Sequence, residues 1–576
     1  MSTPSSLEPA ALWRLRAAPE GAEAALAASG RFAPLTRRLL AARGIADAAS
    51  AAAFLDPAEG LRHAPGLLPG MEAAVARLAE AWRRGEKVAV FGDYDVDGVT
   101  STVLLAKLFG LLKLTHELYL PDRIREGYGP NVPALQALRD RGASVVVTVD
   151  CGTGSVAEAA AARAMGLDLI ITDHHLPSGP LPAALALVNP QAAPGYPYAM
   201  LGGVGVAYKL AQALLEALDH PRREEFLDHM LELVALGTVC DVAPLDGENR
   251  SLVRDGLQRL RRGRWLGLRC LAEAAGVDLA AADAGTLGYA LGPRLNAGGR
   301  VGDAMLGVRL LLGKDGAECR ALAGRLDAAN RERQALEKGV VEQALRAAEA
   351  PLARGAQGLV LWDEAWHPGV VGLAASRLLE RFGRPVFVFG VAAGLAKGSG
   401  RARRPFNLVQ ALGACAPLLL KHGGHAAAAG ATADPARLPE FAEAFAAQAA
   451  PLEPADLRPT LDIDLEARLD EVSPAWMDEL RAFEPHGARN PRPLFIARGL
   501  RLGRGTRAVG AEGAHLKLTL DQGRASLGGI AFRQGARLGE LGQAGPLDAA
   551  FHLSWNTYNG TRSIQLDVRD LRSSAP

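Results

Sequence analysis

The chain has 576 residues, enough for several domains, and its 64 Lys and Arg residues nearly balance its 63 Asp and Glu residues. Net charge therefore does not indicate a nucleic-acid partner, and any basic surface must be local. The five cysteines form no CxxC pair, which argues against a disulfide framework or a structural zinc site and favours a reducing cytoplasm.

The N-terminus lacks an apolar signal core, and no stretch of the chain approaches about 18 uncharged apolar residues. We therefore expect a soluble, cytoplasmic protein without a membrane partner. Residues 1–80 are rich in Ala, Leu and Arg, which predicts an N-terminal segment of short helices without recognisable chemistry.

Short apolar runs alternate with amphipathic helical patterns between residues 87 and 175. The predicted strands are "KVAVFGD", "HELYLP", "SVVVTVD" and "DLIITDHH". Continuous apolar strands separated by helices are typical of a parallel sheet that is covered on both faces. The pattern predicts an α/β domain over residues 81–250.

Acidic and imidazole side chains follow three of these strands. They are Asp93, Asp95, Asp97, Asp150, Asp173, His174 and His175, and Asp241 ends a later apolar helix. Ligands bind beyond the carboxyl ends of the strands in open α/β sheets, so we expect these groups at one edge. A single aspartate after a strand is commonly a helix N-cap, and a lone histidine pair is more often structural. Metal binding explains better why four separate segments converge on one edge.

The mixture of ligands indicates which metal this edge holds. Carboxylates with one imidazole and no thiolate suit Mn²⁺, with Mg²⁺ as the second candidate and Zn²⁺ less suited. Five or six ligands exceed what one ion needs once water is counted, which indicates two ions that share a carboxylate. Because two-metal sites activate water and stabilise the leaving oxygen, the sequence predicts phosphoester hydrolysis.

The rest of the chain divides by its pattern into three regions. Helical patterns dominate residues 251–350 and end in a long charged helix that we expect to connect two lobes. A second α/β pattern occupies residues 351–455. Over residues 456–576, strands with turn signals predict a small β-barrel whose last hairpin is closed by Asn559 and Gly560.

Several polar residues of these regions lie among glycines. They are Arg123, Arg294, Asn296, Arg300, Ser399 and Arg401. Glycine lets a backbone approach a phosphate closely, and arginine binds it through two hydrogen bonds, so the pattern predicts phosphate contacts. Ordinary surface arginines would give the same pattern. The segment "GGHAAAAG", which holds Gly424 and His425, suits either a substrate-contacting loop or tight helix packing around a buried histidine.

Basic residues outnumber acidic ones between residues 495 and 572, and aromatic residues lie among them. The aromatic residues are Phe495, Phe532, Phe551, Trp555 and Tyr558. A basic groove with stacking aromatic rings is how OB-folds hold single strands. The same residues would also fit a barrel whose core holds the aromatic rings and whose arginines face solvent. Because a metal pattern is present elsewhere in the chain, we favour the OB-fold.

Four segments resemble the motifs of the DHH phosphoesterase superfamily: "FGDYDVDGVTS", "VTVDCGT", "ITDHHLP" and "VCDVAPL". "GGHAAAAG" resembles the signature of its DHHA1 companion domain. With "PDRIREGYG" and "RLNAGGRVGDA", the chain is most similar to the bacterial RecJ family from about residue 60 to the C-terminus.

The resemblance implies a role for each residue of the metal pattern. Asp95 and Asp97 each favour one ion, Asp150 bridges the two, and His174 and Asp241 complete the second site. A further residue, His175, faces the scissile phosphate, so the implied catalytic residues are His175, Asp150 and Asp97. The role of Asp93 is less defined, because Phe91 stands where pyrophosphatase-type members carry a metal-binding histidine.

The resemblance also implies the whole architecture: a parallel-sheet DHH domain, a long connecting helix, an α/β DHHA1 domain and a C-terminal OB-fold. The implied activity is 5′→3′ degradation of single-stranded DNA to 5′-mononucleotides in DNA repair and recombination. Expected partners are single-stranded DNA, single-strand-binding protein and a helicase. Two alternatives are a DHH phosphodiesterase of short oligonucleotides or cyclic dinucleotides and a non-catalytic single-strand-binding scaffold.

Overall fold

The computed structural model describes residues 11–56, 61–123, 125–177, 179–392, 394–558 and 560–574. The chain separates into two compact units. One unit contains residues 59–457, and the other combines residues 10–58 with residues 458–576. No helix in the described part of the chain has both the length and the apolar composition that crossing a membrane requires.

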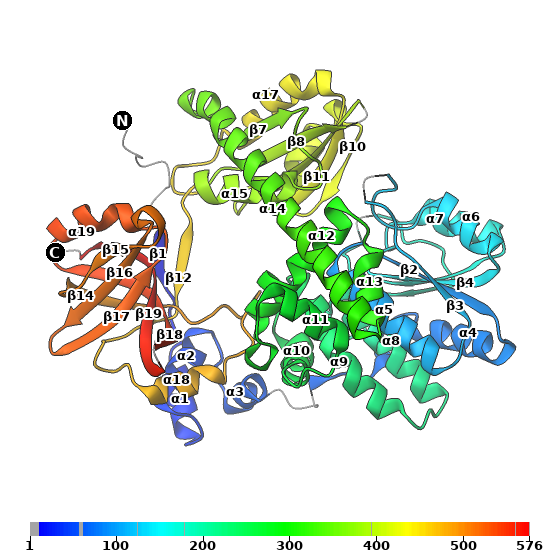
Figure 1. Cartoon of the computed structure of the whole chain (residues 1–576), viewed down its shortest axis with the longest axis horizontal. Coiled ribbons are helices and arrows are strands. Elements are labelled where there is room, and N and C mark those ends of the chain that lie inside the picture. Colours follow the sequence, from blue (N-terminus) through cyan, green and yellow to red (C-terminus); the bar gives the residue numbers. More distant parts are fainter. Residues whose placement is uncertain are drawn as a thin grey trace. The chain divides into compact units, whose positions relative to one another are not determined.

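The first unit begins with the expected parallel sheet, in the order β3-β2-β4-β5-β6 (Figure 1). Its strands are β2 (Lys87–Gly92), β3 (His116–Tyr119), β4 (Ala143–Val149), β5 (Asp168–Thr172) and β6 (Ala186–Val188). Its flanking helices are α4 (Met71–Arg84), α5 (Val96–Leu111), α6 (Val132–Asp140), α7 (Val156–Ala164) and α8 (Gly203–Ala217).

Alternate side chains of each strand enter two separate cores. Val88 and Val90 pack with α4, α5 and α8, whereas Ala89 and Phe91 pack with α6 and α7. Burial on both faces explains why these strands have continuous apolar sequences instead of an alternation of apolar and polar residues.

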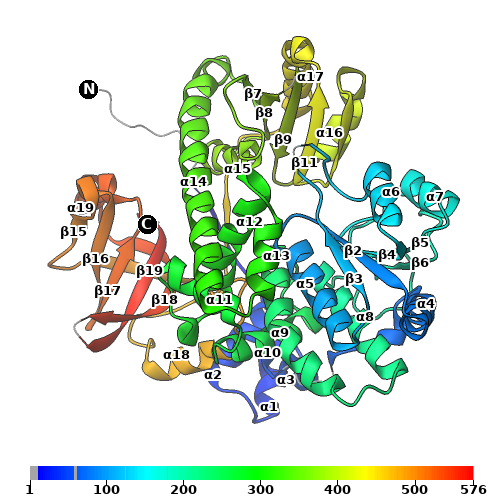
Figure 2. The same cartoon turned by 45° about the vertical axis from the view of Figure 1, so that its right-hand side comes forward.

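A helical layer follows the sheet. Its helices are α9 (Arg223–Cys240), α10 (Gly247–Leu260), α11 (Leu266–Ala275), α12 (Gly292–Val301), α13 (Met305–Leu312) and α14 (Gly316–Ala353). A π-helix at Thr286–Leu291 precedes α12. The 38-residue α14 is the connecting helix that the sequence predicts. Its first part packs on α11, α12 and α13, and its last part packs on α15 and β7 (Figure 2).

A second α/β domain completes the first unit, with strand order β10-β11-β9-β8-β7. Its strands are β7 (Leu359–Asp363), β8 (Val386–Ala392), β9 (Leu395–Arg401), β10 (Lys421–Gly424) and β11 (Ala428–Ala433). Its helices are α15 (Val371–Phe382), α16 (Leu408–Ala414) and α17 (Leu438–Ala449). Helices α14 and α15 cover one face, and α16 and α17 cover the other.

The second unit contains a closed barrel. Strand β14 pairs with both β18 and β16, and the remaining pairs β18–β19, β19–β17 and β17–β16 complete the ring. The strands are β13 (Leu465–Glu466), β14 (Phe495–Leu502), β15 (Arg507–Val509), β16 (His515–Gln522), β17 (Ala525–Ala531), β18 (Leu547–Tyr558) and β19 (Thr561–Ser573). A five-stranded closed ring is the OB-fold architecture. The predicted last hairpin is present as β18 and β19, while Asn559 of its turn lies outside the described residues.

The N-terminal segment packs on this barrel. Its elements are β1 (Leu12–Leu15), α1 (Ala22–Ala28), α2 (Pro34–Ala42) and α3 (Ala48–Leu55), and the barrel side adds β12 (Thr460–Ile463), α18 (Pro474–Arg481) and α19 (Leu538–Gln543). The sequence predicts only helices for residues 1–80, but residues 12–15 form a strand because they pair in parallel with β12. The predicted domain boundary at residue 80 stays a proposal.

A buried ion-pair network fastens α2 to the barrel. The guanidinium of Arg43 donates from Nε to Oδ1 of Asp464 at 3.1 Å, and from two other nitrogens to Asn490 Oδ1 at 2.6 Å and the Pro491 carbonyl at 2.8 Å. Arg43 and Asp464 side chains are only 9% and 2% exposed. Removal of one partner of a buried pair leaves the other charge without compensation, which costs about 3–5 kcal/mol.

We expect Arg43→Ala to lower the free energy of unfolding of the second unit by about 3 kcal/mol. Arg14→Ala is the matched control, because Arg14 pairs with Asp462 through a side chain that is 71% exposed, and such pairs contribute about 0–1 kcal/mol. Urea unfolding of the full-length variants measures both changes. Equal losses for Arg43→Ala and Arg14→Ala would contradict the assignment of the buried network.

Candidate metal centre and phosphate pocket

The carboxyl ends of three adjacent strands, together with Asp241 at the end of α9, bring the predicted metal ligands together. Three groups have ligand atoms that all lie within 4.8 Å of one another. They are Asp93–Asp95–Asp150, Asp97–His174–Asp241 and Asp150–His174–His175. Because Asp150 and His174 each belong to two groups, the three groups form one continuous cluster.

The imidazole of His174 lies at the centre of this cluster. Its Nε2 atom is 3.1 Å from Asp150 Oδ1, 3.6 Å from Asp241 Oδ2 and 3.9 Å from Asp97 Oδ2. Burial and the neighbouring His175 lower the pKa of His174 to about 4, so the ring is neutral at pH 7. A neutral imidazole offers a nitrogen lone pair, which is the form that binds metal ions.

Backbone amides hold the aspartates in place. The Oδ1 atom of Asp95 accepts hydrogen bonds from the amides of Asp97 at 3.0 Å and Gly98 at 3.1 Å, and thereby caps the start of α5. The carboxylate of Asp97 accepts from the amides of Gly203 at 2.7 Å and Val204 at 2.8 Å, at the start of α8. The positive end of each helix thus faces a carboxylate.

Close packing around Asp150 and Asp97 requires glycine. A Cβ atom at Gly203 would lie 2.7 Å from Asp150 Oδ1, and one at Gly237 would lie 2.8 Å from Asp97 Oδ1. The backbone of Asp150 has φ of 61°, a left-handed conformation that aspartate tolerates better than most residues. No motif in the sequence identifies these two glycines, because their contacts join segments that are far apart in the chain.

The electrostatics of the cluster fit bound cations. Burial and repulsion among the carboxylates raise the pKa of Asp97 to about 7 and raise those of Asp93, Asp150 and Asp241 well above the usual value. Among the described residues, buried Asp93 Oδ1, Asp150 Oδ1 and His174 Nε2 have no hydrogen-bond partner. Buried carboxylates are normally paired or coordinate metals, so this donor set suits Mn²⁺ or Mg²⁺.

A second histidine is held in the opposite charge state. Asp173 Oδ1 lies 2.7 Å from His175 Nδ1 and accepts from the amide of His174, while Oδ2 accepts from the amide of Thr153. Burial lowers the pKa of His175, but the Asp173 carboxylate outweighs it and raises that pKa to about 9. His175 is therefore an imidazolium at neutral pH. The phenol of Tyr128 lies 3.1 Å from His175 Nδ1 and donates to the Asp150 carbonyl.

The sequence indicates that Asp173 lies at the sheet edge, but it does not reveal that this residue orients His175. The partner of Asp173 depends on side-chain geometry. Its position directly before the histidine pair is the only signal that identifies it. Tyr128 carries no signal beyond its place in "PDRIREGYG".

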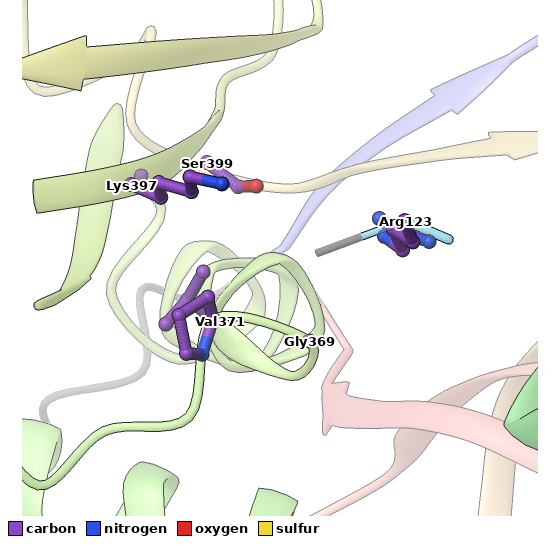
Figure 3. A pocket seen from close by; sticks show the side chains of 7 residues that line it. Arg123, Gly369, Val371, Lys397 and Ser399 are labelled. Carbon is purple, nitrogen blue, oxygen red and sulfur yellow. The ribbon is translucent and has the colours of Figure 1, made fainter. Parts of the chain in front are cut away.

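Two of the predicted phosphate-binding residues, Arg123 and Ser399, line a pocket of about 140 Å³. Arg123 lies on one side, and Ser399 and Lys397 of β9 lie opposite, with Gly369 and Val371 at its floor (Figure 3). Burial and repulsion from Arg123 lower the pKa of Arg401, and the same two causes lower that of Arg300 to about 10. Arginines that repel one another favour a bound anion between them.

Two further candidates have structural partners. Arg294 donates from Nε to Asp327 Oδ1 at 3.0 Å and also to the Ala290 carbonyl, so its guanidinium is held by α14 and by its own helical region. The side-chain oxygen of Asn296 accepts from the amide of Val96 at 3.2 Å and so helps to position the start of α5.

The segment "GGHAAAAG" forms a hairpin in which Gly424 ends β10, His425 begins the exposed turn, and Ala428 begins β11. The alternative of tight helix packing around a buried histidine is therefore wrong, because both residues are exposed. The amide of His425 donates to the Ala428 carbonyl at 2.7 Å, which closes the turn and leaves the imidazole on the surface.

The aromatic residues of the barrel divide into two classes. Phe495 and Phe551 are fully buried in the barrel core, so they are core residues and not stacking surfaces for bases. Phe532 is 57% exposed, and Trp555 is half-buried with the Arg562 guanidinium 3.8 Å from its ring centre. Because Trp555 packs against the barrel core and the Arg562 guanidinium lies over its ring, Phe532 is the one of these four whose ring is exposed for stacking with a base. The side chain of the fifth, the tyrosine that ends β18, lies outside the described part of the chain.

Comparison with known proteins gives three family matches along the chain. The DHH family N-terminal domain matches residues 87–238, the DHHA1 domain matches residues 355–450, and the RecJ OB domain matches residues 463–570. The single-stranded-DNA-specific exonuclease RecJ of Escherichia coli is 38% identical over 568 residues, which cover 93% of this chain and 96% of that protein. The Bacillus subtilis protein of the same name is 37% identical over 542 residues, and this match covers 93% of this chain and 68% of the Bacillus subtilis protein.

Solved structures agree with the sequence matches. The crystal structure of RecJ in complex with Mn²⁺ from Thermus thermophilus superposes with a TM-score of 0.85 at 33% identity, covering 98% of this chain and 80% of that one. The Mg²⁺ complex from the same organism gives a TM-score of 0.79 at 32% identity, covering 98% and 79%.

The close approach of Gly203 to Asp150 leads to a test. Gly203→Ala is expected to weaken Mn²⁺ binding by about tenfold, because its Cβ atom would displace a shared ligand, and even residues behind ligands change metal affinity about 10–100-fold. Gly110→Ala in α5 is the control, since nothing lies within 4 Å of a Cβ there. Isothermal titration calorimetry with Mn²⁺ measures both. Equal affinities for the two variants would contradict the packing argument.

Proposed function

Because the chain belongs to the RecJ family of DHH phosphoesterases, we propose that it is a metal-dependent exonuclease that degrades single-stranded DNA. It acts from the 5′ end, releases 5′-mononucleotides and serves DNA repair and recombination in the cytoplasm. The observation that carries the proposal is the buried carboxylate cluster with neutral His174 at its centre, in the same unit as the pocket that Arg123 and Ser399 line.

The six residues that would hold two Mn²⁺ or Mg²⁺ ions are Asp93, Asp95, Asp97, Asp150, His174 and Asp241. When bound, such ions activate water for attack on the phosphodiester and stabilise the charge of the leaving oxygen. Asp150 belongs to two of the three ligand groups, so its carboxylate would be the one that both ions share. Asp97 is fixed in turn by the amides at the start of α8.

His175 supplies the positive charge and the proton. Its Nδ1 is engaged by Asp173, so its Nε2–H is left to donate to a phosphoryl oxygen or to the leaving group. The pKa of about 9 keeps that proton present at neutral pH.

The pocket that Arg123 and Ser399 line supports degradation from the 5′ end. Arg123, Ser399 and Arg401, with Arg300 nearby, would bind the terminal 5′-phosphate while the next linkage lies on the metal centre. A terminal phosphate carries one more ionisable oxygen than an internal diester, so these groups bind an end more strongly than a middle. Arg294 is left out of this group because Asp327 binds it.

Two alternative functions each leave one feature of the molecule unexplained. A phosphodiesterase of short oligonucleotides or cyclic dinucleotides leaves the matched OB domain without a role. A non-catalytic scaffold leaves the complete ligand set without a role. The barrel supports binding of longer strands through its basic surface, and single-strand-binding protein and a helicase are the proposed protein partners.

The activity is tested on a long 5′-phosphorylated single strand and on a dinucleotide, with Mn²⁺ present. The wild type should convert the long strand to mononucleotides. Asp150→Ala should lower turnover by more than about a hundredfold, because it removes a ligand shared by both ions, yet it should still bind single strands. Asp140→Ala, an exposed aspartate at the end of α6, is the control and should keep full activity. Near-normal turnover by Asp150→Ala would refute the two-metal assignment.

End recognition is tested with Arg401→Ala. Its activity should fall about tenfold to a hundredfold on 5′-phosphorylated strands and much less on 5′-hydroxyl strands, because a charged hydrogen bond contributes about 1.5–3 kcal/mol. The exposed Arg346→Ala variant of α14 is the control. The measurement is kcat/KM for both substrates. Equal losses on the two substrates would make Arg401 a general backbone contact.

A further inference from the structure

A buried asparagine joins two segments that lead to the metal cluster. Asn249 lies in the first turn of α10 with its side chain fully buried. Its Nδ2 group donates to the carbonyl of Met200 at 2.6 Å and to the carbonyl of Pro244 at 3.0 Å. One amide group therefore satisfies two carbonyls that belong to separate loops.

Each of these loops carries part of the metal cluster. The loop of Met200 continues to Gly203 and Val204, whose amides bind the carboxylate of Asp97. The loop of Pro244 begins at Asp241, whose Oδ2 lies 3.6 Å from His174 Nε2. Asp97 and Asp241 thus lie in one ligand group, and the side chain of Asn249 connects the loops that place them.

The loop of Asp241 needs such an anchor. Val242 has φ of 60°, and its side chain is 71% exposed. A β-branched residue rarely adopts this conformation, and it persists only where the surroundings fix it. The hydrogen bond from Asn249 to Pro244 fixes the loop two residues after Val242. A second bond, from the phenol of Tyr198 to Asp246 Oδ1 at 2.6 Å, joins the same two loops.

We propose that Asn249 is a positioning residue that sets the separation of Asp97 and Asp241 and thereby the affinity of the metal site. The proposal rests on the metal centre of the proposed function. Asn249 contacts no ligand atom itself. Its effect reaches the cluster through the backbone of the two loops.

The test uses Asn249→Asp in the full-length protein. Aspartate keeps the size of the side chain but lacks the NH₂ group, so it cannot donate to both carbonyls. Mn²⁺ binding is measured by isothermal titration calorimetry, which does not depend on activity. We expect binding about tenfold weaker than in the wild type, with the number of sites unchanged.

Asn490→Asp is a matched control from the second unit. Asn490 is also buried and donates from Nδ2 to two carbonyls, Phe483 at 2.8 Å and Pro485 at 2.7 Å. It should lower thermal stability without any change in Mn²⁺ affinity. A purely structural role for Asn249 predicts the same result for Asn249→Asp, and that result would overturn the proposal.

A milder variant covers the case in which Asn249→Asp does not fold. Tyr198→Phe removes only the hydroxyl that binds Asp246, so it leaves the packing of the ring intact. It should weaken Mn²⁺ binding severalfold, and wild-type affinity in Tyr198→Phe would overturn the proposal in that case. Failure of the wild type to bind Mn²⁺ would instead refute the metal centre itself, so the two failures are distinguishable.

Discussion

Three aspartate side chains buried at one sheet edge are the constraint on which the first unit depends. Asp93, Asp97 and Asp150 are 4%, 1% and 2% exposed, and burial together with repulsion from neighbouring carboxylates such as Asp95 raises the pKa of each. Such a set is stable as carboxylates only with cations bound. The surrounding structure holds these side chains in place against this repulsion, because amides at the start of α8 bind Asp97 and Gly203 leaves room for Asp150.

The arginine group is the counterpart of that cluster. Arg300 and Arg401 are half-buried, and their partial burial together with repulsion from Arg123 lowers the pKa of both. Like charges held close together raise the electrostatic free energy of each cluster, and a bound ligand of the opposite charge would lower it. On the proposed function, a DNA end with cations would offer both complements, the phosphate for the arginines and the metal ions for the carboxylates. The chain thus gives up folding stability at two places that a substrate complex would compensate.

Local patterns in the sequence predict the sheet and the identity of its edge. Apolar runs buried on both faces indicate parallel strands, and the residue after each strand must lie at the carboxyl edge, which is why Asp150 and His174 are found together. Contacts between distant segments carry no such signal. The partner of Arg294 lies 33 residues away in α14. The residues that pair with β1 lie near residue 460, so a strand in a helix-like sequence is not recognisable without them.

The long helix α14 relates the two clusters to each other. At about 1.5 Å per residue, its 38 residues span about 57 Å, and both ends are packed against neighbouring helices. The carbonyl of Gly369 accepts from Arg300 at 3.2 Å, so the loop before α15 also contacts the end of α12 directly. The pocket lined by Arg123 and by Ser399 of β9 thus lies where the two lobes meet. On the proposed function, the separation of this pocket from the carboxylates determines how many nucleotides lie between the bound end and the cleaved linkage, and a separation of one nucleotide would yield mononucleotides whatever the base sequence.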